Sequence, residues 1–153
     1  MKKIVALLTG ILLLVSVAVA EEAPKTIQNV TPLGDIRKKL DEGITIEKVY
    51  YTDGYGFSTS EFTTEDPEEI ARLWDAVNAI VVGKKADGSI TDWYPMIDFC
   101  LSDGTEGIVP FEATWLCIGK DNYEISNAEG FWSLTAALVE KYTEPGREAV
   151  SGS

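Results

Sequence analysis

Apolar residues recur at helical spacing in two long segments of the chain. Between Ile70 and Val81 they fall at i, i+3, i+4, i+7, i+10 and i+11, which is one continuous face of an α-helix. A second stripe consists of Phe131, Leu134, Leu138 and Tyr142. The pattern predicts amphipathic helices over residues 67–81 and 127–142.

The first of these helices follows the acidic stretch TTEDPEE. Asp66 suits the N-cap, because its side chain can accept bonds from first-turn amides, and Pro67 suits the first helical position. Glu69 is expected to reach back to the Asp66 amide as a capping box, and Ser126 with Glu129 predicts a second box. The acidic cluster therefore indicates a helix start rather than an active site or a metal cage.

A shorter helical pattern and several strand patterns complete the chain. Leu33, Ile36 and Leu40 predict a short helix, which Gly43 would end. β-Branched and aromatic residues predict a strand over residues 44–52. Short apolar runs split by turn residues predict a four-stranded antiparallel meander over residues 94–125.

The Asp103-Gly104 turn sets the expected register of the first meander hairpin. A two-residue turn pairs Cys100 with Gly107 and Phe99 with Ile108. On this register one face carries Ile97, Phe99, Leu101 and Ile108, and the other carries Met96, Asp98, Cys100, Val109 and Phe111. Both faces hold apolar residues, so the two long helices could cover one face each or share one.

Together these elements predict an α+β domain: a mostly antiparallel sheet, comprising the meander and the strand over 44–52, packed with the two amphipathic helices. The ends of the chain are expected to lie outside it. Residues 1–20 have the charged start, apolar run and Ala-Val-Ala ending of a secretory signal peptide, cleaved after Ala20. We expect an extended leader over 21–32, a single domain over 33–142 and a disordered tail over 143–153.

Charge and composition exclude several functions. The chain has 13 basic and 25 acidic residues and a net charge of −12. Such a surface repels nucleic acid and anionic membranes, so neither is an expected partner once the signal is removed. The chain has no histidine, which excludes His-based nucleophilic sites and the HExxH zinc motif. We expect no cofactor, no metal site and no catalytic residue set.

The two cysteines are expected to be thiols. In a meander the strands of Cys100 and Cys117 lie two strand spacings apart, about 9–10 Å between Cα atoms, beyond the ~7 Å limit for a disulfide. A bridge would instead require these two strands to lie side by side.

Asp98 and some aromatic residues are the remaining candidates for function. Asp98 lies within an apolar strand, where a raised pKa could make it a general acid, although alternation also predicts a partly solvated Asp there. Trp74, Trp115 and Trp132 are expected to pack in the core. A possible interaction surface consists of Tyr55, Phe57, Trp93 and Tyr94, which lie in or beside predicted turns.

The order of DPEEIARLWDAVNAI, TDWYP, DG and FWSLTAALVEKY after a signal sequence resembles small exported α+β domains of unknown function from Gram-positive anaerobes, over Ile44 to Tyr142. The resemblance implies the fold and export and carries no catalytic residues. The sequence favours an exported, non-catalytic domain that binds a protein or peptide in the cell envelope or outside the cell. The alternative is a glycan-binding module or a small carboxylate-based glycan hydrolase, with Trp93, Tyr94 and Asp98 as candidates.

Overall fold

The computed structural model describes residues 25–54, 60–86, 95–112 and 115–143. In these residues the chain forms an α+β domain, with an eight-stranded antiparallel sheet and three α-helices. The elements along the chain are β1 (Lys25–Thr26), the short 3-10 helix η1 (Ile27–Asn29), α1 (Leu33–Asp41), β2 (Ile46–Thr52), β3 (Glu61–Thr64), α2 (Pro67–Asn78), β4 (Val81–Ala86), β5 (Met96–Leu101), β6 (Glu106–Glu112), β7 (Trp115–Ile118), β8 (Asp121–Ser126) and α3 (Glu129–Thr143).

The sheet has the spatial order β1-β4-β8-β7-β6-β5-β2-β3, and every pair is antiparallel. The run β5 to β8 is the predicted meander, which is confirmed. β2, also predicted, adds at one end of it beside β5, and β4 adds at the other end beside β8. Within the predicted leader, β1 pairs with β4 and Ile27 of η1 is fully buried.

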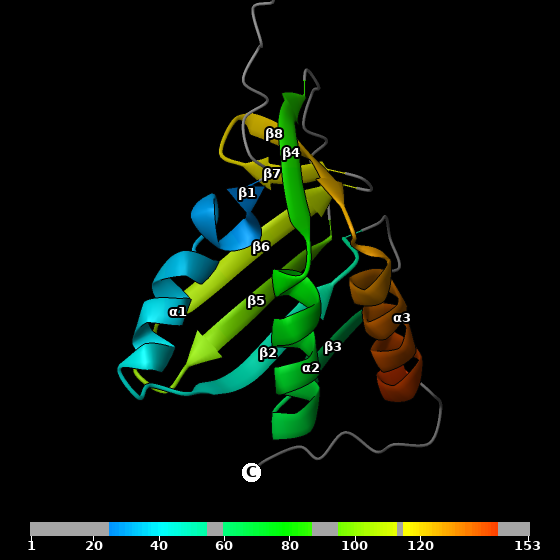
Figure 1. Cartoon of the computed structure of the whole chain (residues 1–153). Coiled ribbons are helices and arrows are strands. Elements are labelled where there is room, and N and C mark those ends of the chain that lie inside the picture. The colour runs from blue at the N-terminus through cyan, green and yellow to red at the C-terminus, as the bar shows by residue number, and fades with distance from the viewer. Residues whose placement is uncertain (1–24, 55–59, 87–94, 113–114, 144–153) are drawn as a thin grey trace, which may run out of the picture.

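All three helices cover one face of the sheet (Figure 1). α1 lies over β6, α2 crosses β5 and β2, and α3 packs beside α2 over β2 and β3. The short helix predicted from Leu33 is confirmed as α1. The two long helices share one face of the sheet instead of covering one face each. None of the helices in the described part of the chain is long and apolar enough to cross a membrane.

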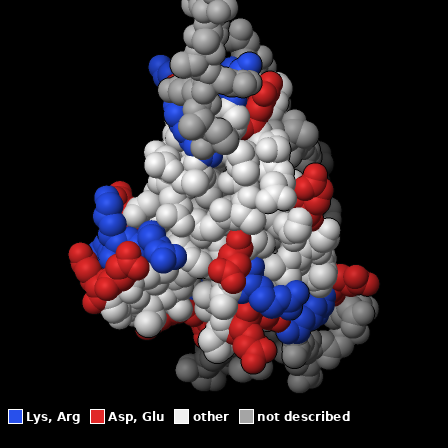
Figure 2. Space-filling model, in the orientation of Figure 1, with Lys and Arg blue, Asp and Glu red and all other residues white. Residues whose placement is uncertain are grey.

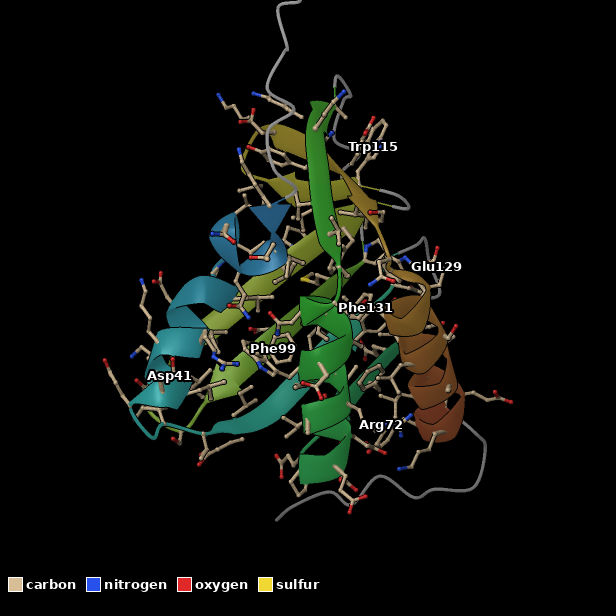
Figure 3. All side chains as sticks on the ribbon, viewed as in Figure 1. Asp41, Arg72, Phe99, Trp115, Glu129 and Phe131 are labelled. Atoms are coloured by element: carbon tan, nitrogen blue, oxygen red, sulfur yellow. The ribbon has the colours of Figure 1, made fainter. Side chains whose placement is uncertain are left out.

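Aromatic rings form the centre of the layer between helices and sheet. The ring of Trp74 on α2 meets that of Phe99 on β5 edge-on, with centroids 5.4 Å apart. Phe131 on α3 packs against Phe111 of β6 at 5.1 Å and against Tyr51 of β2 at 6.4 Å. Figure 3 shows Phe99 and Phe131 in this layer, and both side chains are fully buried.

The first hairpin of the meander has a different register from the predicted one. Leu101 donates its amide to the carbonyl of Thr105, at 2.8 Å, so the turn has three residues rather than two. Gly104 adopts a φ of +81°, which a three-residue turn requires of its last residue. Phe99 consequently pairs with Gly107, not with Ile108. A shift of one residue moves side chains to the opposite face, so Ile108 is 45% exposed on the open face.

That shift places Val109 and Phe111 on the helix-covered face, where both are fully buried. They join Ile97 and Phe99 there, whereas the predicted register places these two pairs on opposite faces of the sheet. The open face instead carries Met96, Asp98 and Cys100 of β5, all half-buried. The apolar residues expected on both faces are therefore concentrated on one, which explains why the helices share that face.

Both long helices are shorter than the sequence predicts. α2 ends at Asn78, whose side-chain amide donates to the carbonyl of Trp74 at 2.7 Å. Residues 81–86, which the sequence predicts as the helix end and the start of a polar connector, form β4. α3 begins at Glu129, because Asn127 has a left-handed φ of 58° and donates its side-chain amide to the carbonyl of Ala79. Ser126 belongs to β8, so the second predicted capping box does not form.

Candidate binding groove beside helix α3

An open hollow of about 500 Å³ lies between one side of α3 and the end of the β2–β3 hairpin. We call it the α3 groove. Its described lining consists of Tyr51, Asp53, Ser60, Trp132, Thr135, Ala136, Val139, Glu140 and Thr143. The wall from α3 therefore extends over most of the helix.

Helical spacing explains the α3 wall. Trp132, Ala136, Val139 and Thr143 follow one another at i, i+4, i+7 and i+11, which places them on one side of the helix. The core stripe, which includes Phe131 and Leu138, is the neighbouring side. Thr143 donates its hydroxyl to the carbonyl of Val139, at 2.6 Å, so this hydroxyl is engaged within the helix. These four residues therefore contribute mainly apolar surface to the α3 wall.

Trp132 is the largest side chain of that wall and is held in place by two other rings. Its ring meets that of Phe111 edge-on at 5.4 Å between centroids, and that of Phe131 at 4.8 Å. The residue is only half-buried, so part of the indole faces the groove. The sequence reading placed Trp132 in the core, and the structure shows that it belongs to both the core and the groove.

The opposite wall is fixed by the end of the β2–β3 hairpin. The amide of Ser60 donates to Oδ1 of Asp53 at 3.0 Å, and the amide of Asp53 donates to the carbonyl of Ser60 at 2.9 Å. The first bond orients the Asp53 carboxylate, and the second joins the two backbones of the hairpin. Tyr51, two residues earlier, stacks on Phe62 of β3 with centroids 5.3 Å apart. The wall is therefore ordered by bonds that do not depend on a ligand.

The charged residues among the described lining are acidic. Asp53 comes from the hairpin wall and Glu140 from the α3 wall, and Glu140 is exposed. On the helix-bearing face, Figure 2 shows charges of both signs gathered over α1 and over the lower part of α2 and α3, with an uncharged region between them. The groove thus offers negative charge without a lysine or arginine in its described lining.

A hydrogen-bond network around the buried Glu69 carboxylate ties α3 to α2 and β3. Oε2 of Glu69 accepts from the hydroxyl of Thr64 at 2.6 Å and from that of Tyr142 at 2.8 Å, and its Oε1 accepts from Lys141. Burial raises the pKa of Glu69, but the bonds from Lys141, Thr64 and Tyr142 outweigh it, and the pKa lies below its ordinary value. The network fixes the position of α3.

Glu69 is therefore not the capping-box residue that the sequence predicts. The amide of Asp66 donates to the hydroxyl of Thr64, at 3.1 Å, so that amide has a different partner. The other half of the prediction is confirmed: Oδ1 of Asp66 accepts from the amides of Glu68 and Glu69, and Pro67 occupies the first helical turn. The acidic stretch is a helix start, with one acid used for tertiary contacts.

Asp98, the candidate general acid, lies on the open face and does not line the α3 groove. There the structure brings it together with Cys100 and Glu106, whose potential ligand atoms all lie within 4.8 Å of one another. Burial, and then the charge of Glu106, raises the pKa of Asp98, which the Gly107 amide and the Cys100 thiol only partly oppose. Oδ1 of Asp98 is buried without a hydrogen-bond partner among the described residues.

The sequence reading missed Glu106 because the register was wrong by one residue. In the structure Cys100 pairs with Glu106 across β5 and β6. One thiol and two carboxylates are donor types that zinc accepts, so this cluster is where the described residues come nearest to a metal site. Glu106 is exposed, and acidic groups of this kind commonly gather on an open sheet face without an ion. We treat the cluster as part of the solvated face.

Both cysteines are thiols, as the strand order predicts. β6 lies between β5, which carries Cys100, and β7, which carries Cys117. Cys117 is 3% exposed and Cys100 is half-buried on the open face. Burial, and then the charges of Asp98 and Glu106, raises the pKa of the Cys100 thiol.

The predicted interaction surface is not tested by the structure. Tyr55, Phe57, Trp93 and Tyr94 all lie outside the described residues. The residues of the α3 groove were not singled out in the sequence, although the side of α3 next to its core stripe carries Trp132, Ala136 and Val139 at helical spacing. A large aromatic beside, rather than within, a core stripe is the pattern that could have indicated this wall. Comparisons with protein-family models, curated proteins and solved structures find no match to this chain.

Proposed function

We propose that the protein is an exported, non-catalytic domain that binds a peptide segment of a protein partner in the α3 groove. The observation that carries the proposal is the groove itself: its volume of about 500 Å³ falls in the range of ligand sites, about 300–1,000 Å³. Trp132, Ala136 and Val139 give it apolar contact surface, beside two carboxylates and several hydroxyls. Export rests on the signal-like sequence of residues 1–20.

The shape of the groove favours a segment of chain over a compact ligand. The α3 wall runs from Trp132 to Thr143, so the hollow follows most of the helix and is open to solvent. Peptide segments are commonly recognised in open grooves that a few of their side chains enter. Trp132 supplies a rigid aromatic contact of the type that dominates binding energy at interfaces.

Binding without catalysis is favoured by the residues of the groove. The lining holds hydroxyls and two carboxylates, and the chain has no histidine to activate a hydroxyl nucleophile. The hydroxyl of Thr135 donates to carbonyls of its own helix, at 3.1–3.2 Å, and so does that of Thr143. These groups are committed to the helix and serve as contact surface.

A display selection with two matched variants tests this proposal. Random peptides are selected on residues 21–153 and are then tested against Ala136→Trp, which fills the groove, and Ala137→Trp. Ala137 is exposed on α3 but does not line the groove. Selected peptides should lose binding to the first variant and keep it with the second. Peptides that bind both variants equally would contradict a peptide ligand in the groove. So would glycans on an array that bind the wild type and Ala137→Trp but not Ala136→Trp.

The export part of the proposal has its own measurement. Secretion of the full chain from a bacterial host should yield a mature protein whose first residue is Glu21, as intact mass and N-terminal sequencing would show. Cell-associated protein that retains residues 1–20 would contradict cleavage and would leave the groove proposal unaffected.

A further inference from the structure

We infer that the segment bound in the α3 groove presents a lysine or arginine, whose stem lies along Trp132 and whose charge lies near Asp53 and Glu140. The inference rests on the proposed function and names the chemistry of its ligand. The groove carries negative charge, because both charged residues of its described lining are acids, and these come from opposite walls.

The two walls together suit a long cationic side chain. Lysine and arginine carry an apolar stem that packs on apolar surface while the charged end stays in a polar setting. Ala136 and Val139 of α3 provide apolar surface next to the Trp132 indole. A cation placed over an aromatic face gains about 0.5–2 kcal/mol, and an indole is the best such face. The groove thus offers both the apolar and the charged part of the required contact.

The orientation of the Asp53 carboxylate is fixed before any ligand binds. Its Oδ1 accepts from the Ser60 amide, which orients the group. An orientation fixed in advance lowers the entropy lost on binding, which favours a charge-assisted bond to an ammonium or guanidinium group.

Other ligand classes fit the groove less well. An acidic segment would meet Asp53 and Glu140 as well as a protein with a net charge of −12. A wholly apolar segment would take the exposed Glu140 carboxylate out of water without supplying an opposite charge, which costs free energy. A basic side chain avoids both penalties, and the acidic protein would also speed its approach at low salt.

The test uses the peptides whose binding depends on the groove, meaning those that Ala136→Trp abolishes and Ala137→Trp does not. Because the whole chain is acidic, basic peptides could bind elsewhere, and this filter removes them. In each remaining peptide the lysine is replaced by acetyl-lysine, or the arginine by citrulline. The dissociation constant should rise about tenfold, the order expected when one charge-assisted hydrogen bond is lost. These replacements leave the protein's fold untouched.

Protein variants give an independent measurement with the same peptides. Glu140→Gln should weaken binding several-fold and reduce its dependence on salt, whereas Glu42→Gln, which removes an exposed charge at the end of α1, should change neither. Groove-dependent peptides without a basic residue, or an unchanged affinity after acetylation, would overturn the inference while the groove remained a peptide site. If no peptide is sensitive to Ala136→Trp, the proposed function itself fails.

Discussion

Lys141 of α3 forms an ion pair with Glu69 of α2, and the two side chains differ sharply in exposure. The Glu69 side chain is 8% exposed, whereas that of Lys141 is 43% exposed. The carboxylate is also held by the hydroxyls of Thr64 and Tyr142, so one buried acid connects β3, α2 and α3. The pair thereby sets where α3 lies, and with it one wall of the groove.

Replacing Glu69 by Gln should destabilise the protein by about 2 kcal/mol, the order of a lost bond to a charged group. The glutamine keeps the shape but presents an NH₂ group where Lys141 or a hydroxyl now donates. Urea unfolding at pH 7 measures the loss. Glu68→Gln, at the exposed neighbouring position in the same helical turn, is the control and should stay within about 0.5 kcal/mol.

The difference between wild type and Glu69→Gln should also depend on pH. The folded pKa of Glu69 is lowered, so its stabilisation is present above the ordinary value of 4.5 and is lost as the pH falls through the folded pKa. Urea midpoints of the two proteins should therefore converge below pH 4.5. A gap that stays constant down to strongly acidic pH would mean that the side chain acts through packing alone.

Asp98→Asn should have the opposite pH signature. Burial and the charge of Glu106 raise the pKa of Asp98. The folded protein is therefore more stable with Asp98 protonated, and it loses stability as the pH rises through the folded pKa. The amide cannot ionise, so the variant should have the higher urea midpoint at pH 7 and no advantage near pH 3. A lower midpoint at pH 7 would show that the carboxylate is held by a partner, such as a bound cation.

The two thiols should react at different rates in the native protein. Denatured, non-reduced protein should give two reactive thiols per chain, because the structure has no bridge between Cys100 and Cys117. In the native state only Cys100 should react with a thiol reagent, and slowly at neutral pH, because its pKa is raised. Glu106→Gln should speed that reaction. A chain with no reactive thiol after denaturation would refute the strand order.

Gly107 is required by the contact between α1 and β6. A Cβ at Gly107 would clash with Cδ1 of Ile36, so α1 or the Ile36 side chain would have to move. Gly107→Ala should therefore cost about 1–3 kcal/mol. Adding Ile36→Val, which removes that methyl group, should recover part of the loss in a double-mutant cycle. Gly130→Ala, which meets nothing within 4 Å in α3, should be neutral or stabilising.

Local patterns predicted most of the fold. The periodicity of Ile70 to Val77 and the Asp66-Pro67 start located α2, and the turn residues separated the strands of the meander. The errors lie where two local rules compete. Asp103-Gly104 suggests a two-residue turn, but placing Gly104 last in a three-residue turn also satisfies its need for a positive φ.

The strand β4 and the groove could not be predicted for a different reason. The β4 sequence VVGKKA has little alternation of apolar and polar residues, and only Val82 of it is fully buried. This segment becomes a strand because β8 pairs with it. The groove depends on how α3 sits against the end of the β2–β3 hairpin, which is a tertiary relationship. Glu69 shows the same limit: its helical position predicted a local cap, and Lys141, 72 residues away, determines its actual role.

The order of strands also constrains how the chain can fold. The hairpins between β5 and β8 close over short loops, whereas β2 must wait for β5 and β4 must wait for β8. Because longer loops cost more entropy to close, we expect the meander to form first and β2 and β4 to attach later at its two sides. Until Ser126 has been synthesised, the first half of the chain has unsatisfied strand edges, and this is the interval in which aggregation would compete with folding.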